Sequence, residues 1–270
     1  MKKIIRKKFS PSQYSIIDFD SIEASEKAVK IMRSKKCLND IYSEMYHYIM
    51  NVSDRKLTSK NKDIQVLEIG SGGGFIKDLY PNVITSDIKP INNVDMIINA
   101  ETLPFENSSL DKILAVHVIH HIPDIEQFLS EALRVLKLGG GLVCIEPYWS
   151  PMAKFLYKNV HPEPFDINVP NWNLKSSGPM SGSNQALSYI LLKRDKEIFN
   201  KKFPQFEIIR LKRFGFIRYF CTGGIWLKQK LPDFCFKFLK AIELLLKPLM
   251  PLLAIHHAFI LKKISNEING

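Results

Sequence analysis

The sequence has few of the features that define several large classes of protein. Its 270 residues include four cysteines, and no two of them form a C-x-x-C pair. Zinc sites are commonly built from such closely spaced cysteines, so we expect no zinc site and no other metal site. The four residues, Cys37, Cys144, Cys221 and Cys235, also give no indication of disulfide bonds.

Long apolar segments are also missing. The longest uncharged run that is mainly apolar, residues 248–261, contains two prolines and two histidines. A helix that spans a bilayer needs about 20 apolar residues, which excludes this run as a spanning segment. The N-terminus carries a basic arm without a following apolar region or cleavage site, so we expect no secretory signal and a cytoplasmic protein. The arm consists of Lys2, Lys3, Arg6, Lys7 and Lys8.

Acidic residues are scarce relative to basic ones. Aspartate and glutamate number 27 against 38 lysines and arginines, which gives a formal charge of +11. Such an excess attracts nucleic acid, anionic lipid or acidic substrates, but it does not determine the fold. The hydrophobic content of 46% is sufficient for the core of one large domain.

The most informative segment that is present is V-L-E-I-G-S-G-G-G-F at residues 66–75. It predicts a short strand that carries Glu68 into a glycine-rich turn. Gly70 and Gly72 allow main-chain N–H groups to approach a bound nucleotide closely. A dinucleotide fingerprint requires a third glycine where this chain has Phe75, so a pyrophosphate ligand is not favoured.

Two further predicted strands follow the glycine turn. Residues 82–87 form a second predicted strand that ends at Asp87, 17 residues after Gly70. A carboxylate at about this distance accepts hydrogen bonds from ribose hydroxyls in doubly wound folds, although a solvated turn is the alternative. Residues 94–98 form the third run and lead into Asn99.

The next segment predicts a strand, a helix and another strand. Residues 110–116 form the fourth strand and open into a histidine-containing turn at 117–123. Asp124 is a suitable N-cap for an amphipathic helix, and we expect Gly139 to Gly141 to end that helix. The fifth strand then runs over residues 142–145 and leads to Glu146.

Several motifs in this region resemble one known family. E-x-G-x-G-x-G at 68–74 resembles motif I of class I S-adenosylmethionine (SAM)-dependent methyltransferases. Downstream, L-P-F at 103–105, the pair His120-His121, R-V-L-K at 134–137 and G-G at 139–140 follow in the order typical of the widespread methyltransferase domain. The resemblance implies a Rossmann-like α/β fold. Its doubly wound sheet has seven strands, mostly parallel with an antiparallel last strand, and is accompanied by N-terminal helices and a helical insertion before that strand.

The resemblance also implies SAM as the cofactor. It places Asp87 at the ribose and Asn99, where the family has aspartate, at the adenine amino group. His117 is expected to lie along the cofactor. The residues expected to bind SAM are Glu68, Gly70, Ser71, Gly72, Gly74, Asp87, Ile88, Asn99, Ala100, Glu101 and His117.

Three parts of one integrated domain are expected. Residues 1–63 hold the basic arm, cap helices at 22–32 and 38–50, and a polar linker from residue 51. The cap helices either cover the SAM pocket or pack on the sheet edge. The SAM-binding core is 64–150. Residues 151–270 hold an aromatic substrate lid, a sixth strand at 206–215, a hydrophobic insertion and a seventh strand at 258–263.

The insertion contains a predicted helix at 234–248 with a narrow charged stripe of Lys237, Lys240, Glu243 and Lys247. One interpretation is a peripheral contact with an anionic membrane. The other is an internal wall of the substrate pocket or a dimer contact. The oligomeric state stays open.

The predicted activity is methyl transfer from SAM to a small or lipid-linked acceptor, as O-methylation. The protein must hold the acceptor in line with the methyl group and exclude water. A general base helps when the acceptor is a hydroxyl, and the candidates are His120, His121, His161 and Glu146. Each of them has packing or cofactor contact as an alternative role.

Two other functions remain open from the sequence. The positive charge is compatible with an RNA methyltransferase, but no appended RNA-binding module and no N-P-P-Y or D-P-P-Y segment follows the fourth strand. A SAM-binding scaffold without catalysis is the other alternative. The intact Glu68, Gly70, Gly72 and Asp87 argue against such a degenerate site.

Overall fold

The fold is built around one sheet of apolar strands. The computed structural model describes residues 20–58, 64–161, 163–176, 178, 182–225 and 227–266. The basic arm predicted at the N-terminus lies outside these residues. The strands are β1 (Val66–Ile69), β2 (Ile84–Asp87), β3 (Met96–Ile97), β4 (Leu110–Val116), β5 (Leu136–Pro147), β6 (Phe206–Phe214) and β7 (His256–Lys263).

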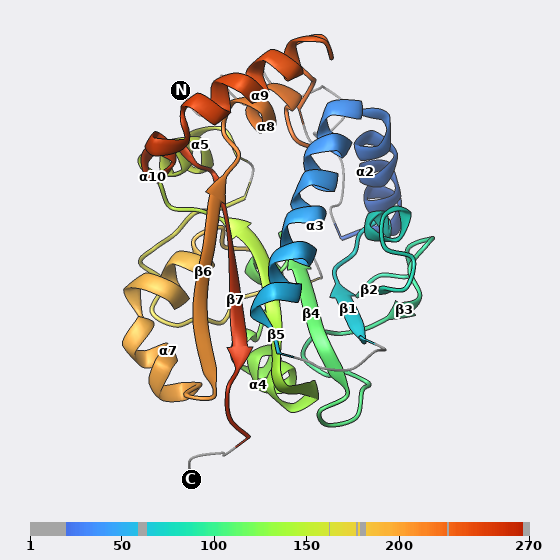
Figure 1. Cartoon of the computed structure of the whole chain (residues 1–270), viewed down its shortest axis with the longest axis vertical. Coiled ribbons are helices and arrows are strands. Elements are labelled where there is room, and N and C mark those ends of the chain that lie inside the picture. The colour runs from blue at the N-terminus through green and yellow to red at the C-terminus, as the bar shows by residue number, and fades with distance from the viewer. Residues whose placement is uncertain are drawn as a thin grey trace.

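The strand order is β3-β2-β1-β4-β5-β7-β6 (Figure 1). The pairs among β1 to β5 are parallel, whereas β7 runs antiparallel to both of its neighbours. Every residue of β4 is buried, as expected for a strand covered by protein on both faces. The predicted fold class is therefore confirmed.

Helices cover both faces of the sheet. They are α2 (Ile22–Ser34), α3 (Lys36–Lys56), α4 (Ile125–Val135), α5 (Pro151–Asn159), α6 (Leu187–Tyr189), α7 (Lys196–Lys202), α8 (Ile217–Thr222), α9 (Cys235–Leu245) and α10 (Met250–Leu253). Short turns of other helix types are η2 (Phe75–Asp78), η3 (Ile119–His121), η4 (Ile190–Arg194) and η5 (Lys247–Leu249). No helix within the described ranges combines the length and apolar character that crossing a bilayer requires.

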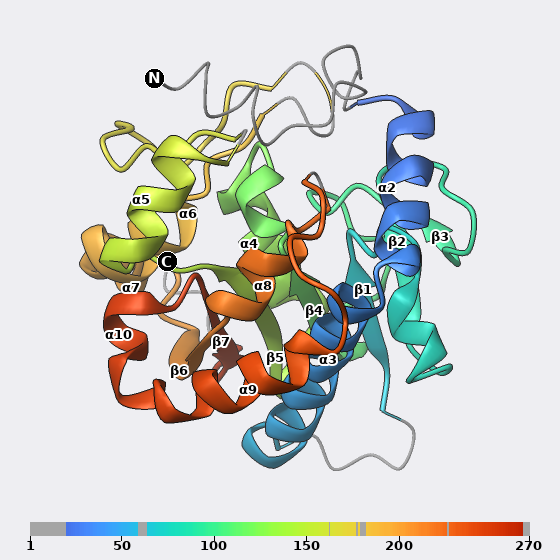
Figure 2. The same ribbon diagram turned by 90° about the horizontal axis from the view of Figure 1, so that it is seen from above.

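Two apolar clusters hold these layers together. On one face, α3 packs Ile41, Met45 and Ile49 against β-strand residues such as Val143 and Ile260. On the other face, α4 and α7 pack against the sheet through residues that include Phe128, Leu129 and Phe199. The view from above shows α8 and α9 of the insertion beside α3 and α2, at the end of the sheet where the parallel strands finish (Figure 2).

Two predicted boundaries were wrong. The segment 51–56, expected as linker, continues helix α3, because its buried Ser53 lies on the same helix face as Met45 and Ile49. Residues 139–141 do not end helix α4 but lie within β5, which begins directly after Val135. A Cβ on Gly140 would lie 2.7 Å from the carbonyl oxygen of Asp111, so the glycine allows β5 to lie close to β4.

The glycine turn after β1 depends on left-handed backbone conformations. Gly72 and Gly74 have φ of 62° and 64°. A Cβ on Gly72 would meet no atom within 4 Å, whereas a Cβ on Gly74 would lie 2.3 Å from the carbonyl oxygen of Asn93. Gly74 is therefore required both by its backbone angle and by close packing.

We predict that Gly74→Ala destabilises the protein more than Gly72→Ala. Both substitutions impose left-handed strain of about 1–3 kcal/mol, and Gly74→Ala adds a clash with the backbone at Asn93. Urea unfolding of the cofactor-free protein measures both free energies of unfolding. Equal losses in the two variants would contradict the packing role of Gly74.

Candidate functional site

A cavity of about 490 Å³ lies at the carboxyl ends of β1, β2 and β4. Its floor is the glycine turn, and its cover includes Val29 and Met32 of α2 and Tyr42 and Tyr46 of α3. A Cβ on Gly73 would lie 2.6 Å from the side chain of Val29, so α2 rests directly on the turn. The volume falls within the range of about 300–1,000 Å³ that is usual for small-molecule sites.

Asp87 connects β2 to the glycine turn. Its Oδ2 accepts a hydrogen bond from the N–H of Gly72 at 3.1 Å, and its Oδ1 accepts from the N–H of Lys89 at 3.0 Å. The side chain is almost buried, and burial raises the pKa of Asp87 despite these bonds. A carboxylate is thus fixed at the rim of the cavity, where it can accept further hydrogen bonds.

Glu68 lies under the glycine turn. Tyr46 donates a hydrogen bond from its O–H to Oε1 of Glu68 at 2.6 Å, and the carboxyl group is 1% exposed. Burial raises the pKa of Glu68 to about 7, although the bond from Tyr46 opposes this shift. The side chain of Glu68 therefore joins β1 to α3 beside the cavity.

We predict that Glu68→Gln gains stability relative to the wild type as the pH rises. The folded-state pKa of about 7 lies above the unfolded value of about 4.3. Ionisation of Glu68 therefore lowers the free energy of unfolding between these two pH values, and the glutamine variant escapes this loss. Urea unfolding between pH 4 and 8 should show a difference of a few kcal/mol that levels off above pH 7.

The exposed Glu106, changed to Gln, is the matched control for that series. A difference between wild type and Glu68→Gln that does not change with pH would contradict the burial of an ionisable Glu68.

The predicted cofactor residues divide into two groups. Eight of them line the cavity: Gly70, Ser71, Gly72, Asp87, Ile88, Asn99, Ala100 and His117. Glu68, Gly74 and Glu101 are not among the described residues of the lining. Glu101 instead accepts a hydrogen bond from the N–H of Asp124 at 2.8 Å, and so it supports the start of α4. Binding of SAM by the eight lining residues stays a prediction.

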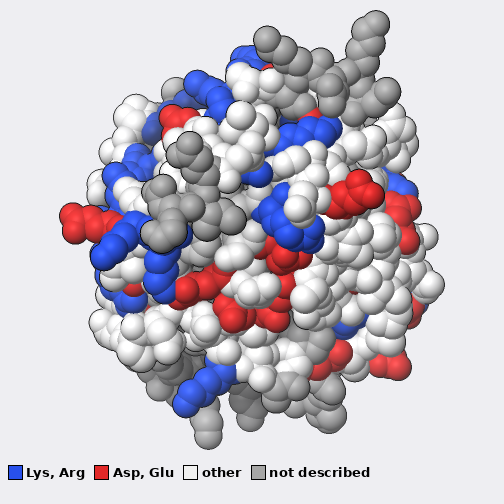
Figure 3. Space-filling view, turned by 90° about the horizontal axis from the view of Figure 1, so that it is seen from below, with Lys and Arg blue, Asp and Glu red and all other residues white. Residues whose placement is uncertain are grey.

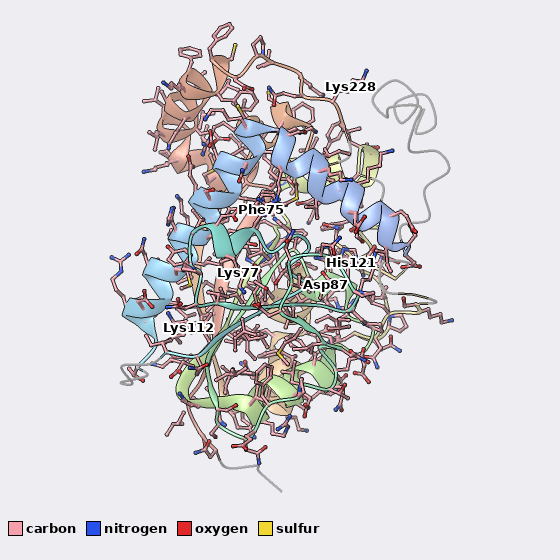
Figure 4. All side chains as sticks on the ribbon, turned by 90° about the vertical axis from the view of Figure 1, so that its right-hand side faces the viewer. Phe75, Lys77, Asp87, Lys112, His121 and Lys228 are labelled. Atoms are coloured by element: carbon pink, nitrogen blue, oxygen red, sulfur yellow. The ribbon has the colours of Figure 1, made fainter. Side chains whose placement is uncertain are left out.

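A second cavity of about 230 Å³ adjoins the first. Tyr42, His117, His121 and Ile225 line both cavities. Other residues of its wall come from distant parts of the chain: His120, Tyr157, His161, Glu163, Tyr219, Phe220 and His256. In the side view, His121 and Asp87 lie close together below α2 (Figure 4).

His117 separates the two cavities in a strained conformation. Its φ of 59° is left-handed, which is uncommon for a residue with a side chain. Its ring packs against the ring of His256, with centroids 4.6 Å apart, and burial lowers the pKa of His117 to about 4. Such strain is typical of functional sites, where the surrounding structure imposes it.

Glu146 fixes the turn that carries the paired histidines. The carboxylate is fully buried, and its Oε1 accepts hydrogen bonds from the N–H groups of Val118 and Ile119 at 2.9 and 3.0 Å. Its Oε2 lies 2.5 Å from Nδ1 of His120. Glu146 therefore positions His120 and does not face a ligand directly.

His120, His121 and Glu163 converge at the second cavity. Nε2 of His120 and Nε2 of His121 lie 3.6 and 3.7 Å from Oε2 of Glu163. Burial opposes the charge on His120, but Glu146 and Glu163 outweigh it and raise its pKa to about 10. Burial and the neighbouring His120 lower the pKa of His121 to about 4. Burial tends to raise the pKa of Glu163, yet the histidines hold it well below its usual range.

The four predicted catalytic residues thus lie in one region. His161 also lines the second cavity, and its Nδ1 accepts a hydrogen bond from the N–H of Glu163 at 3.2 Å. Sequence reasoning missed Glu163, which belongs to the segment predicted as a substrate lid. Its nearness to His161 in the sequence was the available signal.

Comparison with known proteins identifies the family. Residues 67–144 match the model described as a methyltransferase domain. The ubiquinone/menaquinone biosynthesis C-methyltransferase UbiE of Rickettsia prowazekii is 43% identical over 181 residues, which cover 57% of this chain and 70% of that protein. The chain belongs to the class I SAM-dependent methyltransferases. SAM is the cofactor of this family, as the sequence motifs predict.

Other relatives align over shorter segments or with lower identity. UbiE of Brucella canis is 46% identical over 57 residues, which is 21% of each chain, so the match spans about a fifth of that methyltransferase. A SAM-dependent methyltransferase of Thermotoga maritima is 17% identical, with coverage of 87% of this chain and 99% of that chain and a TM-score of 0.47. The fold assignment rests on the strand order itself.

Proposed function

We propose that this protein transfers a methyl group from SAM in the first cavity to a small or lipid-linked acceptor in the second. The observation that carries the proposal is the shared wall of Tyr42, His117 and His121. Methyl transfer requires donor and acceptor to lie in contact without intervening water. Two adjoining cavities that are covered by helices meet this requirement.

The first cavity fits SAM in its chemistry. Gly72 leaves open space where a side chain would stand, and Asp87 offers carboxylate oxygens for ribose hydroxyls. Asn99, which also lines the cavity, has an amide for the adenine edge. SAM supplies a methyl group that is already activated for transfer.

The second cavity favours a compact acceptor with a polar group. Its volume of about 230 Å³ suits a single ring or a lipid head group, and Tyr157, Tyr219 and Phe220 supply aromatic walls. We place the acceptor oxygen at the cluster of His120, His121 and Glu163. O-methylation of a hydroxyl or phenol is the product we propose.

We propose that His121, one of the four predicted catalytic residues, is the one that contacts the acceptor oxygen. Glu146 is occupied by backbone N–H groups, and Nδ1 of His120 is engaged with Glu146. Nδ1 of His161 already accepts a backbone N–H. His121 is neutral and borders both cavities, so it offers a nitrogen lone pair to the acceptor.

Methylation of a ring carbon is a second candidate. The relatives from Rickettsia and Brucella are named as C-methyltransferases of ubiquinone and menaquinone biosynthesis. An aromatic cavity of this size accommodates either reaction. An RNA acceptor is not favoured by the named relatives, which are C-methyltransferases of quinone biosynthesis. The face of the molecule seen from below also mixes basic side chains with a group of acidic ones, so it offers no continuous basic surface (Figure 3).

We predict that Asp87→Asn binds SAM at least about tenfold more weakly than the wild type, because hydrogen bonds to a charged group contribute about 1.5–3 kcal/mol. Isothermal titration with SAM gives the dissociation constant directly. Asp40→Asn, which removes an exposed carboxylate from α3, is the matched control. Equal affinity in wild type and Asp87→Asn would reject the placement of the ribose.

The insertion supports a lipid-linked acceptor. Phe234, Phe238 and Leu245 follow helical spacing on one side of α9 and are 78%, 69% and 81% exposed. On its inner side, Glu243 bonds to Arg218, which also bonds to Glu44 of α3. Glu243 therefore faces the protein, whereas the apolar stripe of Phe234, Phe238 and Leu245 faces outward.

We propose that this apolar stripe binds the surface of an anionic membrane. Amphipathic helices bury such side chains at the level of the lipid head groups, and nearby lysines attract anionic lipid. Lys237 and Lys247 are exposed beside the stripe. The other predicted role, a wall of the substrate pocket, applies to α8 and the following turn, where Phe220 and Gly223 line the second cavity.

We predict that Phe238→Ser with Leu245→Ser reduces flotation with vesicles that contain phosphatidylserine, because it removes exposed apolar area from α9. The control is Ile198→Ser on α7, which also removes an exposed apolar side chain, on a different helix. Equal flotation of the α9 variant and the wild type would contradict the membrane surface. Binding of SAM should be unchanged in both variants.

A further inference from the structure

The cluster of His120, His121 and Glu163 has the composition of a metal site. Each residue directs one ligand atom toward the others, and the three atoms lie within 4.8 Å of one another. We propose that these residues bind a divalent metal ion with the preferences of Zn²⁺, and that its open coordination position faces the acceptor cavity. This inference rests on the proposed function and changes one role in it: with an ion bound, Nε2 of His121 is a metal ligand, and the ion holds the acceptor oxygen in place of the free imidazole.

The two distances from the histidines to Glu163 are longer than hydrogen bonds and close to those between ligands of a tetrahedral ion. Nε2 of His120 and Nε2 of His121 lie 3.6 and 3.7 Å from the same carboxylate oxygen of Glu163. A tetrahedral ion with bonds of about 2.0–2.2 Å separates its ligands by about 3.3–3.6 Å. The two imidazole rings lie side by side, with centroids 4.3 Å apart, so both can approach one ion.

The contacts of His120 orient its ring and fix its tautomer so that Nε2 can bind a metal ion. Oε2 of Glu146 lies 2.5 Å from Nδ1 of His120, and Glu146 is itself held by the N–H groups of Val118 and Ile119. Donation from Nδ1–H to this carboxylate leaves the lone pair of a neutral imidazole on Nε2. A carboxylate behind a ligating histidine is a recurrent feature of metal sites.

Two hydrogen bonds hold Glu163 in place. Nε2 of Gln185 donates a hydrogen bond to Oε2 of Glu163, and the backbone N–H of Glu163 bonds to His161. The carboxylate is therefore oriented toward the two histidines before any ion binds. Two histidines and one glutamate are a ligand set of catalytic zinc sites, which keep one position for water or substrate.

The position of the cluster defines the expected ligand. His120, His121 and Glu163 all line the second cavity, so a fourth ligand must come from that space. A hydroxyl or phenol oxygen of the acceptor has the right chemistry for it. The absence of closely spaced cysteines led to the expectation of no metal, but this donor set contains no cysteine.

The direct test is titration of the full-length protein with ZnCl₂ alone, in competition with a colorimetric chelator. We expect one tightly bound ion in the wild type and at least about tenfold weaker binding in Glu163→Gln and His121→Ala, which lose a ligand. His47→Ala, which removes an exposed histidine, should bind like the wild type. No tight binding to the wild type, or equal binding in all variants, would overturn the proposal.

A second variant tests the role of Glu146 without removing a ligand. In Glu146→Gln, only the amide oxygen can accept the hydrogen bonds from the N–H groups of Val118 and Ile119. The NH₂ group of the glutamine must therefore face Nδ1 of His120. That arrangement places the imidazole proton on Nε2 and removes its lone pair. We expect zinc affinity about 10–100-fold below that of the wild type, and unchanged affinity would contradict this geometry.

Two further measurements separate this inference from the proposed function. Titration with SAM shows whether each variant is folded and whether the first cavity binds the cofactor, independently of zinc. Substitution with Co²⁺ reports the geometry, and we expect the intense visible absorption of a tetrahedral ion in the wild type and its loss in Glu163→Gln. Normal SAM binding with no cobalt spectrum in the wild type would reject the metal site and leave the proposed function standing.

Discussion

The buried carboxylate of Glu146 is the constraint on which the site depends. A carboxyl group with no exposed surface is tolerated only when hydrogen-bond partners surround it, and two backbone N–H groups and His120 meet this need. These bonds join the end of β5 to the turn after β4. As a result, His120 and His121 are held where the two cavities meet, and the geometry does not rely on a flexible loop.

The central strands were predictable because each has a distinct local signal. The strand β1 leads into the glycine turn and β2 ends at Asp87, and parallel strands bring such ends to one edge of the sheet. The extent of α3 and the path of β5 were not predictable from local pattern. Both depend on contacts with residues far away in the sequence, such as the close approach of Gly140 to Asp111.

The candidate site was also predictable only where its residues have a local sequence signal. The motifs indicated the lining of the first cavity, because the glycine turn and Asp87 have fixed spacing. Glu163 lies 42 residues after His121 in a segment without periodicity, so no local rule connects the two. On α9, the charged stripe was visible in the sequence, but the bonds of Glu243 to Arg218 and of Lys240 to Glu44 depend on residues of other helices.

The account treats the first cavity as the site of the methyl donor and the second as the site of the acceptor. A crystal structure with S-adenosylhomocysteine tests this arrangement most directly. We expect the ribose hydroxyls within hydrogen-bond distance of Asp87 and the sulfur directed at the wall formed by His117 and His121. A cofactor bound elsewhere, or a sulfur that points away from the second cavity, would contradict the account.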